Sequence, residues 1–325
     1  MSRHFALAIL SDVHYASAAE QGEGDDYEYR VIPNPVLRGA IRLYRRHIWL
    51  RYPLRQNGQL DRFLETVPPV DFAIGNGDYS CNTAAVGVCA AAVMQSAREC
   101  LGKLRERFGE KFIAGFGDHE LGKLRLLGTR GGLRLESWRR AIDELGLRPF
   151  WKLELGDWVL IGVTSTLLAL PVFAHDMLSE ERSEWERLRE QHLSQVRAAF
   201  AALLPHQRVL LFCHDPTALP FLWREEKVRA KLPKIEQTII GHLHSNFYLR
   251  VSRLLSGVPV IGSLGHSVRK ITTGLNEARL WWRFRVRLCP SLAGIELLKD
   301  GGYYIAELDA DGKSPARFRF HPLKR

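Results

Sequence analysis

Short apolar runs recur along the chain, and five of them end in a polar cluster. These runs predict buried strands, because a strand covered on both faces is continuously apolar, and the segments between them are long enough for crossover helices. Two further strands are expected at residues 157–166 and 302–313, the second as an edge strand that leads into a turn. The five runs with polar ends lie at residues 4–14, 70–80, 111–120, 208–216 and 237–244.

A long amphipathic helix is expected at residues 179–203. Ser179 is a candidate N-cap, and glutamates follow in the first turn, where they interact favourably with the helix dipole. Apart from insertions, the pattern predicts a single α/β domain.

A second amphipathic helix is expected within residues 34–53. Asn34 is a suitable N-cap, Pro35 suits the first helical position, and Pro53 is expected to end the helix. At 100° per residue the apolar side chains fall within an arc of about 160°. The arginines lie on the opposite side together with Trp49. The helix either packs on the sheet with a solvated arginine face or lies at a membrane interface.

The composition is that of a folded protein and excludes a disordered one. Of the 325 residues, 46% are hydrophobic and 25% are charged. No run approaches the roughly 20 apolar residues of a membrane-spanning helix, and the first apolar run is too short for a signal peptide. The five cysteines form no CxxC pair and are expected to be reduced thiols. These features predict one cytoplasmic domain over residues 1–325.

The polar clusters at the strand ends contain residues that bind metals. Ligands of α/β sheets gather outside the carboxyl ends of the strands. One Asp or His in such a place is commonly a turn or capping residue, but five such ends in one chain are hard to explain that way. The candidates are Asp12, His14, Asp78, Asp118, His119, His214, His242 and His244.

The types of ligand indicate which ions could bind. Mixed sets of carboxylates and imidazoles suit Mn²⁺, Fe and Zn²⁺, whereas an all-oxygen Mg²⁺ or Ca²⁺ cage does not match so many histidines. The set is large enough for two divalent ions, expected to be Mn²⁺, with Fe or Zn²⁺ as alternatives. Two such ions hold a hydroxide at neutral pH and clamp the oxygens of an in-line displacement at phosphorus.

The order of these residues resembles a known family. The chain carries D-x-H, G-N-G-D, G-D-H-E, C-H-D and G-H-L-H in this order between residues 10 and 244. This set resembles the calcineurin-like metallophosphoesterases, whose motifs read D-x-H, G-D-x-x, G-N-H-[DE], an isolated H and G-H-x-H. The resemblance implies a four-layer α/β/β/α sandwich and a metal-dependent phosphohydrolase, either a phosphodiesterase or a pyrophosphatase.

The resemblance also implies a role for each candidate. His119 would lie near the substrate phosphate, where it stabilises charge or protonates the leaving oxygen. Asp78 would bridge the two metals. The family usually has Asn where this chain has Asp118, whose added negative charge is expected to tighten cation binding. The other ligands divide into Asp12, His14 and His244 for one metal and Asp118, His214 and His242 for the second.

The net charge of +10 comes from two segments of the chain. Setting aside six arginines between residues 31 and 60 and four between residues 279 and 287 leaves 36 basic against 36 acidic residues. The second segment, within residues 275–290, alternates basic with aromatic or apolar residues, so it could stack on bases, lie at lipid headgroups or pack in the core. Candidate contacts to a membrane or substrate are Arg38, Arg42, Arg45, Arg46, Trp49, Trp281 and Trp282.

Three functions remain open at this point. In the character of its cationic segments the chain looks like the bacterial UDP-2,3-diacylglucosamine pyrophosphatases of lipid A synthesis, which release UMP. This likeness implies a lipid-linked phosphoester substrate and an anionic membrane partner at the inner face of the membrane. The alternatives are a nuclease or nucleotide phosphodiesterase, with Trp281 or Trp282 stacking on bases, and a non-catalytic metal-binding scaffold. No particular protein partner is implied.

Overall fold

Two five-stranded sheets form the centre of the molecule. The computed structural model describes residues 3–30, 32–81, 83, 85–123, 131–263 and 265–324. The first sheet has the strand order β10-β9-β1-β2-β3 and the second has the order β4-β5-β6-β7-β8. The strands are β1 (His4–Leu10), β2 (Phe72–Gly75), β3 (Phe112–Ala114), β4 (Phe150–Leu155), β5 (Trp158–Val163), β6 (Arg208–Cys213), β7 (Ile235–Ile240), β8 (Val286–Leu288), β9 (Gly302–Asp309) and β10 (Arg317–Pro322).

Most strands run parallel to their neighbours. In the first sheet β1, β2 and β3 are parallel, with Leu7 opposite Phe72 and Ala73 opposite Phe112. In the second sheet β5 to β8 are parallel. Strands β9, β10 and β4 pair in the antiparallel sense. Parallel strands end at the same edge of a sheet, so the loops after β1, β2 and β3 meet at one edge of the first sheet and those after β6 and β7 at one edge of the second.

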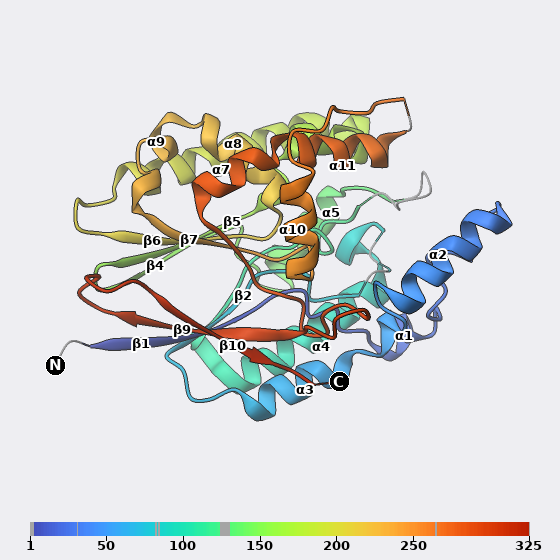
Figure 1. The fold of residues 1–325 in the computed structure, drawn as a ribbon, viewed down its shortest axis with the longest axis horizontal. Coiled ribbons are helices and arrows are strands. Elements are labelled where there is room, and N and C mark those ends of the chain that lie inside the picture. Colours follow the sequence, from blue (N-terminus) through green and yellow to red (C-terminus); the bar gives the residue numbers. More distant parts are fainter. Residues whose placement is uncertain are drawn as a thin grey trace.

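Helices cover the outer face of each sheet (Figure 1). Leu101 of α4 belongs to the apolar core beneath the first sheet, and Val196 of α7 belongs to the core above the second. All five cysteines are free. The helices are α1 (Ala18–Gln21), α2 (Pro35–His47), α3 (Asn57–Thr66), α4 (Ala91–Phe108), α5 (Leu135–Asp143), α6 (Ser165–Leu168), α7 (Arg182–Ala201), α8 (Leu219–Arg224), α9 (Glu226–Arg229), α10 (Asn246–Leu254) and α11 (His266–Glu277).

Strand β1 shows why the chain forms four layers. Its side chains alternate between two cores: Ala8 and Leu10 face the helices of the first outer layer, while Leu7 and Ile9 pack between the sheets. Both faces of the strand are therefore buried, as its continuous apolar run requires. The predicted α/β/β/α arrangement is confirmed.

Two local predictions were wrong. Strand β9 is not an edge strand, because it pairs with β1 on one side and with β10 on the other. Helix α7 begins at Arg182 rather than at Ser179, since residues 179–181 form a separate 3-10 turn. The segment that alternates basic and apolar residues contains two elements: Ala278–Phe284 form a 3-10 helix, and Val286–Leu288 form β8.

Helix α2 begins as predicted and ends early. The Asn34 side chain accepts hydrogen bonds from the backbone N–H groups of residues 36 and 37. The helix ends at His47, because the carbonyls of the next two residues accept from the N–H groups of Leu297 and Glu296 instead. It projects from the body of the molecule (Figure 1), and Val36 is 80% exposed. The alternative in which this helix packs on the sheet is therefore wrong.

Candidate metal centre

The candidate ligands after β1, β2 and β7 have left-handed backbone conformations. The φ angles are 51° for Asp12 and His14, 58° for Asp78, 59° for His242 and 58° for His244. Asp and His tolerate this region better than most residues, but it still carries strain. Within the described part of the chain, seven non-glycine residues have positive φ. Five of these seven are the candidate ligands in these loops. Backbone strain gathered in one place indicates a functional site.

Three of the candidates form a first group. The Oδ1 atom of Asp12 lies 3.3 Å from Nε2 of His244, and Nε2 of His14 lies 3.1 Å from the same nitrogen. One ligand atom from each residue lies within 4.8 Å of the others, and all three side chains are buried.

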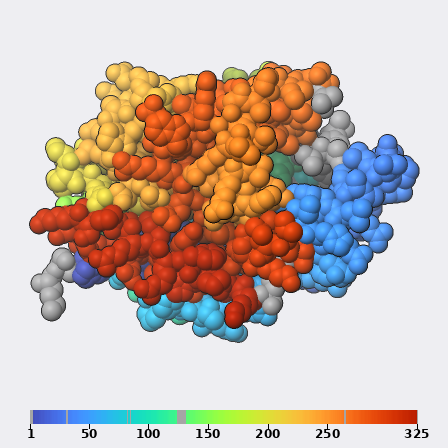
Figure 2. Space-filling model, viewed as in Figure 1, coloured from blue at the N-terminus to red at the C-terminus, as the bar shows by residue number. Residues whose placement is uncertain are grey.

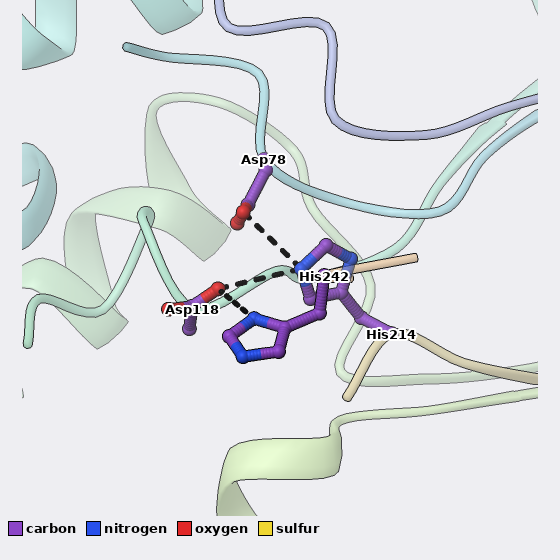
Figure 3. Close-up of side chains that lie close together, drawn as sticks. All are labelled: Asp78, Asp118, His214 and His242. Atoms are coloured by element: carbon purple, nitrogen blue, oxygen red, sulfur yellow. Dashed lines mark hydrogen bonds and ion pairs between the residues drawn. The ribbon is translucent and has the colours of Figure 1, made fainter. Parts of the chain in front are cut away.

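Four candidates form a second group, shown in Figure 3. Nε2 of His214 lies 3.2 Å from Oδ2 of Asp78 and 3.3 Å from Oδ1 of Asp118. Nδ1 of His242 lies 3.2 Å from the same Asp118 oxygen. The four residues come from the loops after β2, β3, β6 and β7, so this group joins the two sheets.

Asp78 lies between the two groups. It also clusters with His14 and His119, and its Oδ2 atom is 3.6 Å from Nε2 of His119. Oδ1 of Asp12 lies 4.0 Å from Nε2 of His214. The structure therefore brings together all eight residues found at the strand ends, and Asp78 clusters with residues of both groups.

The environment of His214 fits a bound cation. Its Nδ1 lies 2.7 Å from the carbonyl oxygen of Asn76, which accepts the Nδ1 proton and directs Nε2 toward the carboxylates. Nε2 is buried without a hydrogen-bond partner, yet it faces two carboxylate oxygens. Burial disfavours the charged imidazole, but Asp78 and Asp12 outweigh it and raise the pKa of His214 well above its usual value, so without a metal a proton compensates the carboxylates. A divalent cation can take the place of that proton among the three atoms. The residues present therefore fit a metal ion.

Two glycines leave space for the ligands. A Cβ atom at Gly241 would overlap Oγ of Ser11 and Oδ2 of Asp12. A Cβ atom at Gly117 would overlap the side chain and backbone N of Asp78. Neither position can carry a side chain without displacing a candidate ligand.

Glu120 is a buried residue to which the motifs alone gave no role. Its carboxylate accepts hydrogen bonds from the backbone N–H groups of Gly117, Asp78 and Tyr79 at 2.8, 3.1 and 2.8 Å. It therefore ties the loop after β2 to the loop after β3 and fixes the backbone of Asp78. The signal available in the sequence was the acid that ends the G-D-H-E motif.

The predicted surface contacts divide into three kinds. Arg38, Arg42 and Arg46 are exposed on α2, whereas Arg45 is buried and pairs with Glu28 at 2.9 Å. Trp49 lies beyond the end of α2 rather than on its arginine face, and its ring centroid is 4.5 Å from that of His244.

The two tryptophans of the second segment differ from each other. Trp281 is 3% exposed and belongs to the core above the second sheet, so it is not placed to stack on a base. Trp282 is 61% exposed, with the Arg283 guanidinium 4.0 Å from its ring centroid.

A chelator-treated sample should lose stability as the pH rises. Burial opposes protonation of His242, but Asp215 and Asp118 outweigh it and raise its pKa from 6.5 to about 9. A raised pKa stabilises the fold fully below pH 6.5, and this contribution disappears as the pH rises through 9. We expect the Tm to fall over that interval, and saturating Mn²⁺, which binds neutral imidazole, to offset the fall.

Differential scanning fluorimetry with and without Mn²⁺ measures this effect. The variant His242→Asn should show a smaller dependence of Tm on pH. A chelated wild-type Tm that rises over this interval would contradict the expectation.

No protein-family model matches the sequence, and no curated protein matches it. Among solved structures, the crystal structure of Phosphopantetheinyl Hydrolase (PptH) from Mycobacterium tuberculosis has a TM-score of 0.36 and 16% identity, covering 74% of this chain and 83% of that chain.

Proposed function

We propose that the protein is a dinuclear metal-dependent phosphoesterase that hydrolyses a phosphoester or pyrophosphate bond. The observation that carries this proposal is that two groups of Asp and His side chains lie next to each other. Asp78 belongs to the second group and also clusters with His14 of the first. Two divalent cations bound there would supply a nucleophile from water at neutral pH and neutralise charge on the phosphoryl oxygens. The mixed ligand set favours Mn²⁺, with Fe or Zn²⁺ as alternatives.

The chain's own groups keep the ligands oriented. Asn76 holds the proton of His214 on Nδ1, so that Nε2 points into the centre. Asp12 accepts hydrogen bonds from Oγ of Ser11 at 2.6 Å and from the backbone N–H of His242 at 3.0 Å. Such contacts to ligands typically change metal affinity or activity by 10- to 100-fold when they are removed.

Exposed apolar side chains concentrate in two stretches of the chain. We call residues 34–52, 246–263 and 265–276 the cationic rim. Of the 16 large hydrophobic side chains that are exposed in the described part of the chain, 11 belong to this rim. They are Val36, Leu37, Leu43, Tyr44, Tyr52, Phe247, Leu254, Leu255, Val260, Ile261 and Ile271. A concentration of this kind marks an interaction surface rather than ordinary scatter.

The charges of the rim have one sign. The sequence has no Asp or Glu between residues 31 and 60, and none between residues 237 and 276. The exposed cations of the rim include Arg38, Arg42 and Arg269. Apolar side chains set among cations suit the interface of an anionic membrane. No helix within the described residues is both long and apolar enough to cross a bilayer.

The rim adjoins the metal centre. The hydroxyl of Tyr44 on α2 lies 2.8 Å from that of Tyr248 on α10. Trp49 contacts both Tyr248 and the candidate ligand His244. Figure 2 shows α2, in blue, beside the orange segment that contains α10 and α11. An apolar group held at the rim would therefore lie next to the metals.

These observations support a membrane-borne, nucleotide-linked lipid as the substrate, such as the UDP-2,3-diacylglucosamine of lipid A synthesis. Water would attack a phosphorus of the diphosphate, the bridging P–O bond would break, and UMP and a lipid-linked sugar phosphate would leave. The protein would then act at the inner face of the membrane as a peripheral enzyme.

The test compares three substrates with Mn²⁺ present: UDP-2,3-diacylglucosamine in anionic vesicles, single-stranded DNA, and bis(p-nitrophenyl) phosphate. We expect UMP release from the first at a rate well above cleavage of the second. Faster cleavage of DNA would favour a nuclease, for which the exposed Trp282 is a candidate stacking residue. Full metal occupancy with hydrolysis of none of the three would indicate a scaffold.

A further inference from the structure

Lys123 lies in the metal centre although no motif includes it. Its Nζ atom is 2.6 Å from Nε2 of His119 and 3.1 Å from Oδ2 of Asp118. Its side chain is 35% exposed, so part of it is accessible although it contacts buried ligands.

The two oxygens of Asp118 face different partners. Oδ1 lies near His214 and His242, on the side where a cation fits. Oδ2 faces Lys123. Burial alone would raise the pKa of Asp118, but Lys123 and His242 outweigh it and hold that pKa well below its usual range. An asparagine at this position would present an oxygen on one side and N–H donors on the other. The Asp118–Lys123 pair presents the same pattern with no net charge.

His119 has no N–H group left for a substrate. Its Nδ1 lies 3.0 Å from the carbonyl oxygen of Cys81 and 3.2 Å from that of Ser80, so the proton resides there. Its Nε2 then accepts a hydrogen bond from Lys123. An ammonium group has three hydrogens, and these contacts use two of them. Among the described residues no partner takes the third.

We propose that Asp118 and Lys123 act as one neutral unit, in which Asp118 binds the cation and Lys123 donates its remaining N–H to a phosphoryl oxygen of the substrate. The second half of this statement rests on the proposed phosphoesterase function. Lys123, and not His119, then contacts the phosphate, while His119 positions the ammonium group.

A double-mutant cycle tests the pair, with Mn²⁺ and inorganic phosphate as probes in calorimetric titrations. Asp118→Asn leaves an uncompensated ammonium beside the cations, so Mn²⁺ should bind about 10-fold more weakly or worse. Lys123→Met removes a charged hydrogen bond, so phosphate should bind the Mn²⁺-loaded protein about 10- to 100-fold more weakly. For bis(p-nitrophenyl) phosphate, KM should rise more than kcat falls.

The double variant, Asp118→Asn with Lys123→Met, restores neutrality and places an amide N–H beside the phosphate. Both affinities should return to within a few fold of the wild-type values. Additive losses, or single variants that bind both probes like the wild type, would overturn the proposal.

The surface pair Lys103–Asp61, with Nζ 2.9 Å from Oδ1, is a matched control. The changes Lys103→Met and Asp61→Asn, alone or together, should leave both affinities unchanged. If the wild type binds Mn²⁺ but neither binds phosphate nor hydrolyses the diester, the proposed function fails. The Mn²⁺ arm of the cycle still decides whether Asp118 and Lys123 compensate each other.

Discussion

Replacing Asp78 with Ala should remove most bound Mn²⁺ and reduce hydrolysis of bis(p-nitrophenyl) phosphate by at least about 100-fold. Asp78 lies within reach of both groups of candidate ligands, so its loss affects two cation positions at once. It also leaves His214 with one fewer carboxylate, which weakens the remaining position. Metal content after dialysis, measured by inductively coupled plasma mass spectrometry, and initial rates check the two effects separately.

Two further variants keep that result interpretable. Asp78→Asn preserves the shape and tolerates the left-handed backbone, so it separates loss of charge from loss of fold. Asp143→Ala makes the same chemical change at an exposed position of α5 and should retain full metal content and activity. Wild-type rates from Asp78→Ala would refute a dinuclear metal mechanism at this site.

The variant Leu43→Glu should bind anionic vesicles about 10- to 100-fold more weakly than the wild type. Leu43 is 60% exposed on α2. Burying such a side chain in lipid contributes about 1.5–3 kcal/mol, and a glutamate there also repels anionic headgroups. Vesicle co-sedimentation measures binding, and UMP release measures hydrolysis of the lipid-linked substrate.

The matched control is Leu204→Glu. Leu204 is 50% exposed after α7, at the start of the loop into β6 and outside the rim. This control should bind vesicles like the wild type, and both variants should hydrolyse the soluble diester normally. Equal vesicle binding by Leu43→Glu and the wild type would exclude α2 as a membrane contact.

The centre of the fold could be predicted because the sequence pattern and the burial agree. Strand β1 is continuously apolar and is buried on both faces, so its length and its polar end follow from local sequence. The positions of Asp12 and His14 follow from the same pattern, since the chain must leave the sheet where the apolar run ends. Short strands with polar ends therefore revealed the candidate ligands before any tertiary contact was known.

What local sequence could not reveal depends on partners far along the chain. Helix α2 ends at His47 because the next carbonyls bind residues 296 and 297, not because of Pro53. Trp281 is buried in one core with side chains of α8 and β8, although basic residues lie near it in sequence. Lys123 contacts Asp118 and His119, but it lies outside the motifs, and its position depends on how the loop folds. Each of these outcomes is a tertiary contact that overrides the local pattern.

The left-handed backbone at five candidate ligands limits how this site can change in evolution. At Asp12, His14, Asp78, His242 and His244 an ordinary L-residue such as Ala costs roughly 1–2 kcal/mol, whereas Gly costs nothing and Asn costs little. A lineage that lost metal binding would therefore keep these loop conformations with the smallest loss of stability by acquiring Gly or Asn at these positions. In a related chain, glycines at these five places would mark a former metal centre.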